Sequence, residues 1–317
     1  MKYKMKYVAP LAAALLLAAC GAKEEGSTSG AAPAPETEEA AEAGPYTVVD
    51  DRGKEVSFEQ VPETIVSLQP SNTEILFALG VGDKIIGATD YDNYPEAAQD
   101  IERVSDSYTF NAERIIEMNP DVVIAYTIGD EAQVEQLEAA GVKVFVISSA
   151  TSFEDVYGDI EQLGDVVGQA TVADEVVEDI KVKISEVQEK TADVAKSKIY
   201  FEIAPSPDIW TTGSKTFQQE ILDAAGVENI FADQQKDWFS VSAEDIIARN
   251  PEQIFTTVYY TEDPVAEIKA RASWDQIQAV QNDLVFKIDA DITGRPGPRI
   301  GEAVELVAKT AYPELFK

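Results

Sequence analysis

The sequence predicts an α/β protein of two lobes joined by a single long α-helix. Short apolar runs typical of buried strands alternate with amphipathic segments, as in an open parallel sheet covered by helices. One helix-and-strand segment occurs twice, and a long helical signal lies between the two copies. Together these three observations favour two related lobes with a helical connection.

The repeated segment combines a short helix with the strand that follows it. Residues 110–126 and 241–257 share the pattern Ala-Glu-x-Ile-Ile-x-x-Asn-Pro, displaced by 131 positions (244 minus 113). A polar residue, Asn111 or Ser242, can cap each acidic first turn. The Asn-Pro pair then ends the helix, because the residue before a proline avoids the helical conformation. An apolar run follows in both copies and predicts a buried strand.

A second repeated sequence pattern supports the duplication. Residues 74–81 and 220–227 both read Glu-Ile-Leu-x-Ala-x-Gly-Val, and each comes before the Asn-Pro segment of its half. Similar α/β units can look alike by chance, but two echoes in the same order favour two related lobes.

The chain begins with features of an exported lipoprotein. A lysine-rich start and an apolar run from Val8 to Ala19 are typical of a secretory signal over residues 1–20. Residues 17–20, Leu-Ala-Ala-Cys, resemble the bacterial lipobox, so we expect Cys20 to be lipidated. Residues 21–45 are rich in Gly, Ala, Pro and Glu and lack bulky apolar side chains, which predicts a disordered acidic tether.

The first α/β lobe is expected over residues 46–167. Segments 47–49 and 56–58 predict a small hairpin around a charged glycine turn. Alternating strands and helices follow, with strands at 65–68, 84–88, 122–124 and 142–147 and helices at 74–79, in the first repeated segment and at 130–140. Ligands of such sheets bind beyond the carboxyl ends of the strands.

A helical signal runs from Phe153 to Ala195. Its second part carries apolar residues at steps of three or four, at Val172, Val176, Ile180, Ile184 and Val187. We therefore expect a bridging helix within residues 168–196. The second lobe, residues 197–317, repeats the α/β alternation and closes with a helix near 299–311.

Composition excludes several kinds of function. The net charge of −33 argues against nucleic acid and anionic membrane surfaces, which both require basic patches. The chain has no His and one Cys, which removes Ser-His-Asp and Cys-His catalysis and the commonest transition-metal ligand. Residues 213–216, Gly-Ser-Lys-Thr, lack the glycine spacing of a phosphate-binding loop and indicate a polar helix start instead. We expect neither catalytic nor metal-ligating residues.

Aromatic residues gather where a cleft between the lobes would lie, beside predicted strand ends. Large rings at such places suit a bulky and partly apolar ligand. Asp291 and Arg295, in the loop before the last helix, add one acidic and one basic side chain to the edge of the expected cleft. The candidate ligand-binding residues are Tyr91, Tyr108, Phe110, Tyr126, Trp210, Trp238, Asp291 and Arg295.

Residues 65–311 resemble the substrate-binding lipoproteins of ABC importers for metal chelates, and cobalamin-binding members most closely. The resemblance rests on the segments 67–74, 91–95, 111–121, 226–231, 238–244 and 298–299. It implies two Rossmann-like lobes bridged by one helix, which is the class III architecture of periplasmic binding proteins. Where cobalamin binders have a tryptophan before the first repeated helix, this chain has Ser107 beside Tyr108.

The resemblance also implies roles for particular residues. Glu113 and Glu244, one in each repeated helix, match the glutamates with which the family docks on arginines of the permease dimer. Their position in an acidic first turn is also explained by the helix dipole alone. Of the candidate cleft residues, it assigns ligand contacts to Tyr91, Tyr126, Trp210, Trp238, Asp291 and Arg295.

These observations lead to one expected function and its alternatives. We expect a monomeric, non-enzymatic receptor, with no cofactor of its own, that captures a metal chelate and delivers it to an ABC permease with its ATPase. Cobalamin is favoured, because the cleft loops offer few basic residues for an anionic ferric siderophore; siderophore and haem remain alternatives. An adhesion or scaffold lipoprotein is a remote alternative. We expect lipid anchoring at the outer face of a bacterial cytoplasmic membrane, with a periplasmic site also open.

Overall fold

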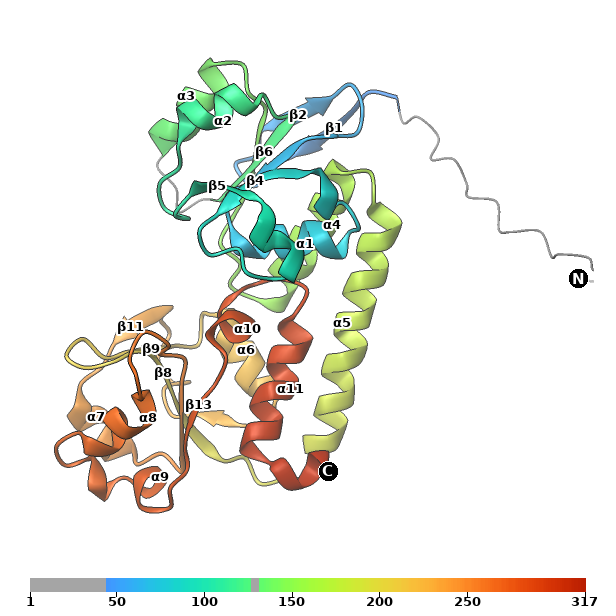
Figure 1. Cartoon of the computed structure of the whole chain (residues 1–317). Coiled ribbons are helices and arrows are strands. Elements are labelled where there is room, and N and C mark those ends of the chain that lie inside the picture. Colours follow the sequence, from blue (N-terminus) through green and yellow to red (C-terminus); the bar gives the residue numbers. More distant parts are fainter. Residues whose placement is uncertain (1–43, 127–130) are drawn as a thin grey trace, which may run out of the picture. The chain divides into compact units, whose positions relative to one another are not determined.

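The computed structural model describes residues 44–126 and 131–317, all of which belong to one compact unit, Glu42–Lys317 (Figure 1). The expected signal sequence, Cys20 and nearly all of the tether lie outside the described residues. Two sheets, one from each half of the described chain, carry the strands that position the candidate site.

The sheet of the first half is fully parallel, with strand order β5-β4-β3-β6-β7. Its strands are β3 (Ile65–Ser67), β4 (Ile85–Thr89), β5 (Glu102–Ser105), β6 (Val122–Tyr126) and β7 (Val144–Ile147). The central strands β3 and β6 consist mainly of apolar residues and are buried except at Tyr126, because helices cover the sheet. An antiparallel hairpin of β1 (Tyr46–Val49) and β2 (Glu55–Phe58) precedes the sheet, as the sequence predicts.

The sheet of the second half has the order β11-β9-β8-β12-β13, with β10 beside β8. Strands β8, β12, β13 and β10 pair in parallel, whereas β9 and β11 are antiparallel. The bounds are β8 (Lys198–Ala204), β9 (Trp210–Thr212), β10 (Glu228–Asn229), β11 (Trp238–Ser240), β12 (Gln253–Thr256) and β13 (Val285–Lys287). The expected α/β fold class is therefore confirmed, and the antiparallel edge is an addition to it.

The helices connect these strands. In the first half they are α1 (Pro70–Ala78), α2 (Ala112–Met118), α3 (Glu131–Ala139) and α4 (Phe153–Val166). The second half has α6 (Phe217–Ala224), α7 (Ala243–Arg249), α8 (Pro264–Ala270), α9 (Gln278–Gln281), α10 (Ala290–Gly294) and α11 (Ile300–Ala311). Short 3-10 turns occur at Gly82–Lys84, Glu96–Asp100, Trp274–Gln276 and Pro313–Phe316. Helix α1 starts four residues before the predicted Glu74, because Pro70 favours the first helical position.

The long helical signal is two helices. Helix α4 ends at Val166, and α5 (Ala170–Thr191) begins after a turn at Gly168, whose positive φ of 68° suits glycine. With 22 residues, α5 is about 33 Å long at ~1.5 Å per residue, and it packs on α4 and α11. In Figure 1 it is the long helix that runs from one half to the other, beside α11. The limits of 46–167, 168–196 and 197–317 for lobes and bridge remain predictions.

The two Asn-Pro segments have the same local structure. Asn111 and Ser242 accept a hydrogen bond from the backbone N of Arg114 and Asp245, as N-caps do. Asn119 and Asn250 end the helices in the left-handed conformation, with φ of 49° and 47°. Strands β6 and β12 follow directly. The duplicated unit is therefore present in both sheets.

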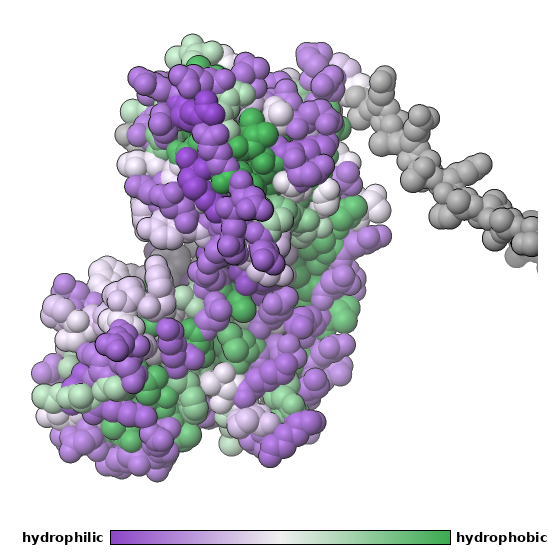
Figure 2. Space-filling model, viewed as in Figure 1, coloured by the Kyte–Doolittle hydropathy of each residue, from purple (hydrophilic) through white to green (hydrophobic). Residues whose placement is uncertain are grey.

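Apolar side chains from both halves form one continuous core that includes α5 and α11, and a smaller core lies on the other side of each sheet. Figure 2 shows mainly hydrophilic residues on the face that it displays, with smaller hydrophobic areas between them. Within residues 44–126 and 131–317, no helix has both the length and the apolar character needed to cross a membrane.

Candidate ligand-binding site

Two adjoining pockets, with volumes of about 390 Å³ and about 360 Å³, lie between the two halves of the described chain. Both are lined by Tyr91 from the first half and by Tyr259 from the second. We call the two pockets together the tyrosine cleft. Its defining side chains are Tyr91, Tyr108, Tyr126, Tyr259, Asp291 and Arg295.

The tyrosines reach the cleft because each follows or ends a strand. Tyr126 is the last residue of β6, and Tyr91 comes two residues after β4. Tyr108 lies in the loop after β5, and Tyr259 lies three residues beyond β12. Since these four strands are parallel within their sheets, their carboxyl ends carry the loops that meet at the cleft.

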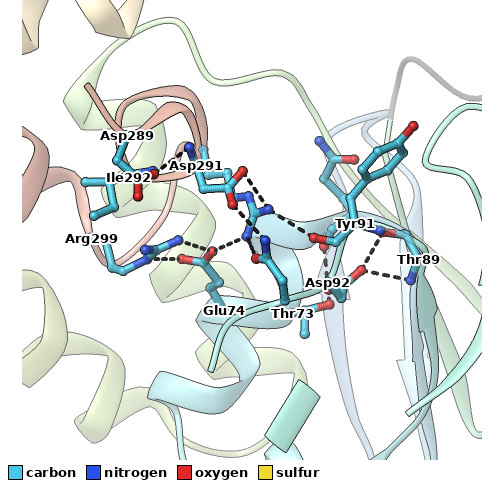
Figure 3. Close-up of polar contacts among 12 residues, drawn as sticks. Thr73, Glu74, Thr89, Tyr91, Asp92, Asp289, Asp291, Ile292 and Arg299 are labelled. Atoms are coloured by element: carbon cyan, nitrogen blue, oxygen red, sulfur yellow. Dashed lines mark hydrogen bonds and ion pairs between the residues drawn. The ribbon is translucent and has the colours of Figure 1, made fainter. Parts of the chain in front are cut away.

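The turn that carries Tyr91 is fixed by a buried carboxylate. Asp92 is 1% exposed and accepts hydrogen bonds of 2.8 Å from the backbone N of Thr89 and 2.5 Å from its hydroxyl. Figure 3 shows Asp92 directed at Thr89, while the ring of Tyr91 points away from this turn. The Tyr91 ring is half exposed as a result and is available to a ligand.

The tyrosines differ in exposure. Tyr108 and Tyr259 are exposed, at 66% and 62%. Tyr126 is half-buried, and this burial raises the pKa of its phenol, although a hydrogen bond with Ser149 opposes the shift. The Tyr126 phenol therefore stays protonated at neutral pH and can donate a hydrogen bond. The pocket of about 390 Å³, which Tyr108 and Tyr126 line, combines aromatic surface with two charged side chains, Asp291 and Arg295.

The polar wall of the cleft is built by α10. Asp289 caps this helix by accepting hydrogen bonds from the backbone N of Asp291 and Ile292, at 2.8 and 3.0 Å (Figure 3). Asp291 Oδ2 accepts a hydrogen bond of 2.8 Å from Asn93 Nδ2, and Asp291 Oδ1 lies 2.9 Å from Arg295 Nη2. The acid and the base that the sequence places at the rim thus form an ion pair.

Arg295 is also bound to the first half of the chain. Its Nη1 donates to Glu74 Oε1 at 2.9 Å and to Asn93 Oδ1 at 2.8 Å. Its Nη2 donates to the backbone O of Tyr91 at 3.0 Å. The Arg295 side chain is only 11% exposed, so its positive charge interacts mainly with the carboxylates and oxygens of the protein and little with solvent.

Glu74 also binds a second arginine, Arg299. Arg299 donates to both oxygens of Glu74, through Nε at 2.7 Å and Nη2 at 2.6 Å, as Figure 3 shows. The guanidinium of Arg299 also stacks on the ring of Tyr94 at 4.1 Å from its centroid. Because the Glu74 side chain is 1% exposed, this buried carboxylate is stable in its charged form only with such partners.

The described lining of the cleft therefore carries no net positive charge. Glu74 and Asp291 offset Arg295 and Arg299, and the pocket of about 360 Å³ carries Asp90, Asp289 and Asp291 against Lys287 and Arg295. The lining of the cleft, as far as the structure describes it, has no excess of positive charge. An anionic ligand would find no unpaired arginine here, whereas a neutral one needs none.

Five predicted binding residues line the cleft: Tyr91, Tyr108, Tyr126, Asp291 and Arg295. Phe110 is 9% exposed and lines a small cavity beside Tyr108 and Tyr126, so it supports the cleft from below. Trp210 is 39% exposed on β9, and Trp238 donates through Nε1 to Gln218 at 3.2 Å; neither lines the cleft. Their contact with a ligand remains a prediction.

Sequence reasoning missed Tyr259 and Glu74. Tyr259 follows β12 just as Tyr126 ends β6, so the search for aromatic residues after strands could have found it. Glu74 carried no such signal, since its partners Arg295 and Arg299 are 221 and 225 residues away. The ion cluster around Glu74 can therefore be recognised only from the three-dimensional structure.

The two candidate docking glutamates lie outside the cleft. Glu113 and Glu244 are the second residues of α2 and α7, and both are exposed. Neither forms an ion pair with a residue in the part of the chain that the structure describes. In the same part, no cluster of three or more potential metal ligands occurs.

The two-sheet fold and the cleft between its halves define a class III periplasmic binding protein. The family model described as "Periplasmic binding protein" matches residues 65–292, and the chain therefore belongs to this family. Proteins of this family bind solutes outside the cytoplasm.

Particular relatives are similar over most of their length. The uncharacterized ABC transporter substrate-binding lipoprotein YvrC of Bacillus subtilis is 36% identical over 319 aligned residues, 98% of both chains. The vitamin B12-binding protein of Vibrio parahaemolyticus is 31% identical over 76% of this chain and 86% of its own. The chain is accordingly an ABC transporter substrate-binding protein, and such proteins work with a permease and an ATPase.

Solved structures of periplasmic binding proteins are also similar to this chain. A possible iron-binding (periplasmic solute-binding) protein of Staphylococcus epidermidis has a TM-score of 0.72 and 32% identity, with 79% of this chain and 99% of that chain covered. The periplasmic vitamin B12-binding protein of Vibrio cholerae has a TM-score of 0.67 and 29% identity, covering 78% and 96%.

Proposed function

We propose that this chain is the receptor of an ABC importer that takes a bulky metal chelate, cobalamin in the first place, into the tyrosine cleft. The observation that carries the proposal is the neutralised arginine. Arg295 is bound by Glu74 and Asp291, so within the described lining of the cleft Lys287 is the one base without an ion pair for an anionic chelate. A large and nearly uncharged ligand fits such a lining. Similarity to vitamin B12-binding proteins supports this choice.

A ferric siderophore or haem is the second candidate. Similarity to a possible iron-binding protein at 32% identity favours it, and the exposed phenols of Tyr108 and Tyr259 are groups that can ligate ferric iron. In either case the metal arrives within the ligand, and the chain needs no cofactor of its own.

Calorimetric titration of the purified protein with cyanocobalamin, haem and an anionic ferric siderophore tests the choice. Saturable one-to-one binding of cyanocobalamin, with much weaker binding of the siderophore, is the expected result. Binding of siderophore or haem without cyanocobalamin would select the second candidate. If no chelate binds while the protein captures another macromolecule, the transport function is wrong and an adhesion or scaffold role takes its place.

Delivery to the permease is assigned to Glu113 and Glu244. Both carboxylates are exposed, unpaired among the described residues and placed identically in the duplicated unit. A permease with two-fold symmetry can offer the same basic site to each of them. The protein acts as a monomer in this proposal, since its two halves supply both docking points.

Anchoring is assigned to Cys20, as a lipidated residue that holds the chain at the outer face of the membrane. The basic start, the apolar run and Leu-Ala-Ala-Cys carry this proposal. The variant Cys20→Ala should move the protein from the membrane fraction to the soluble fraction, while Ser27→Ala should not. Retention of Cys20→Ala on membranes would mean another mode of attachment.

A further inference from the structure

Glu74 and Glu220 start the two echoed segments of the sequence, and each makes a contact from one half of the chain to the other. Glu74 lies in α1, after the first strand of the first sheet, and Glu220 lies in α6, after β8 and β9 of the second sheet. The two helices therefore hold corresponding places in the duplicated fold.

The contact of Glu74 is a buried ion cluster. Its oxygens accept hydrogen bonds from Arg295 and Arg299, at the two ends of the segment between α10 and α11. In Figure 3, Glu74 points from α1 toward Arg299 of the other half. The same segment comes close to the start of α1, since a Cβ on Gly297 would lie 3.6 Å from the backbone O of Ser71.

The contact of Glu220 runs in the opposite direction. Its Oε2 accepts a hydrogen bond of 2.5 Å from the backbone N of Phe153, the first residue of α4. The first amides of a helix have no partner within the helix and carry the positive end of its dipole. A carboxylate from the second half thus binds the beginning of a helix in the first half.

We propose that Glu74 and Glu220 are positioning residues that together set the separation of the two halves and hold Arg295 in the wall of the tyrosine cleft. Arg295 owes three of its contacts to the first half, namely Glu74, Asn93 and the backbone O of Tyr91. Without the Glu74 charge, the guanidinium groups of Arg295 and Arg299 would face each other around a neutral group. Their repulsion would move the segment away from α1 and Arg295 away from Tyr91.

The two contacts differ in strength, which gives the cleft a preferred way to open. Glu74 is fully buried and binds two cations, whereas Glu220 is only partly buried and binds one neutral amide. Charge-assisted bonds to arginine are the stronger kind. The contact at Glu220 is therefore the one that breaks first, and the cluster at Glu74 acts as the pivot.

Distance measurements between two nitroxide labels test the proposal without any ligand. The labels are placed at Gln136→Cys on α3 and Ala270→Cys on α8, both exposed, in the full chain with Cys20→Ser. Glu220→Gln should broaden the distance distribution toward longer values, and Glu74→Gln should shift and broaden it further. Glu74→Asp keeps the charge but shortens the reach, so it should recover the distribution only in part.

Glu138→Gln is the matched control. Glu138 also binds two basic side chains, Arg52 and Lys54, but all three lie in the first half. This variant should leave the distances unchanged. Wild-type distributions in both Glu74→Gln and Glu220→Gln would overturn the proposal. If Glu74→Gln does not fold, Glu220→Gln alone decides, since it leaves the buried cluster intact.

A second measurement concerns Arg295 and rests on the proposed function. Glu74→Gln should weaken binding of cyanocobalamin by about tenfold or more, equivalent to ~1.4 kcal/mol, and Glu138→Gln should not. Unchanged affinity of Glu74→Gln would overturn the positioning of Arg295. If wild-type protein does not bind cyanocobalamin, the proposed function fails, and the label distances still test the contacts between the halves.

Discussion

Glu113 and Glu244 occupy the same helical position, the second residue of the seven-residue helices α2 and α7, and both carboxylates face solvent. The charge reversals Glu113→Lys and Glu244→Lys should together abolish uptake, because the basic sites on the permease would be repelled. Ligand binding should stay unchanged, since neither residue lines the cleft. Uptake into cells and calorimetric titration measure the two effects.

The control for this pair changes the net charge equally at exposed positions of α5. Glu186→Lys with Glu189→Lys should preserve both uptake and binding. Normal uptake by the double variant at Glu113 and Glu244 would contradict the docking role, and the repeated segment would then indicate only that the two halves are related by duplication.

Aromatic contacts should carry much of the ligand affinity. Tyr91→Ala and Tyr259→Ala each remove a ring from both pockets of the cleft, and each should cost ~1–3 kcal/mol of binding free energy. Tyr260→Ala is the comparison: it removes the ring that packs edge-on against Tyr259, at 5.5 Å between centroids, but no ring that lines either pocket, so it should cost less. Equal losses in Tyr259→Ala and Tyr260→Ala would contradict a specific role for the cleft.

Stability should depend on pH through Asp159. Burial, and next the charges of Asp51 and Asp155, raise the pKa of Asp159 to about 8. The folded state therefore keeps a proton that the unfolded state, with a pKa of about 3.9, has lost. The free energy of unfolding should fall as pH rises from about 5 to 7, by up to ~1.4 kcal/mol per unit.

The variant Asp159→Asn tests this dependence, since the amide resembles the protonated acid. Urea denaturation at several pH values should show a smaller loss of stability toward pH 8 than in the wild type. An unchanged slope would mean that other groups cause it, and titration of the Asp159 carboxyl carbon by NMR would identify its pKa directly.

A buried ion pair should stabilise the second half. Arg271 binds both oxygens of Glu202 at 2.5 and 3.0 Å, and the side chain of Glu202 is 0% exposed. Burial raises the pKa of Glu202, and Arg271 opposes that shift. Arg271→Met would leave a buried carboxyl without its partner and should cost ~3–5 kcal/mol of unfolding free energy.

Arg114→Met is the comparison for the buried pair. Arg114 binds Glu102 and Glu117, and all three side chains are exposed. Its loss should cost far less unfolding free energy than the loss of Arg271 in the same urea experiment, because solvent screens an exposed pair. A similar cost for both variants would show that burial does not set the strength of these pairs.

Local patterns predicted much of this fold. The Asn-Pro segments were readable because capping, acidic first turns and apolar strands are properties of neighbouring residues, and both copies have the predicted helix and strand. Thr216 likewise begins α6 as an N-cap, in place of a phosphate loop. A bridging helix was expected from residue 168, and α5 begins just after it, but the positive φ of Gly168 could not be read from an amphipathic pattern.

The candidate site was only partly predictable, because its parts come from distant positions. Tyr91, Tyr126 and Asp291 follow the rule that ligands bind beyond strand ends. The pairing of Glu74 with Arg295 follows no local rule. Because of this ion pair, Arg295 is a neutralised cation and not a free one. A single sequence cannot reveal which of its many carboxylates, 58 in this chain, meets a given arginine.

The distribution of aromatic residues has a spectroscopic consequence. All three tryptophans, Trp210, Trp238 and Trp274, belong to the second half, whereas the aromatic residues that the first half contributes to the cleft are tyrosines. None of the three lines the cleft, so intrinsic tryptophan emission reports on the second half around it, and a ligand held by Tyr91, Tyr108 and Tyr126 alters this emission only through energy transfer or closure. The variant Tyr108→Trp would give the opposite wall an emitter of its own, so that contact with each half could be followed separately.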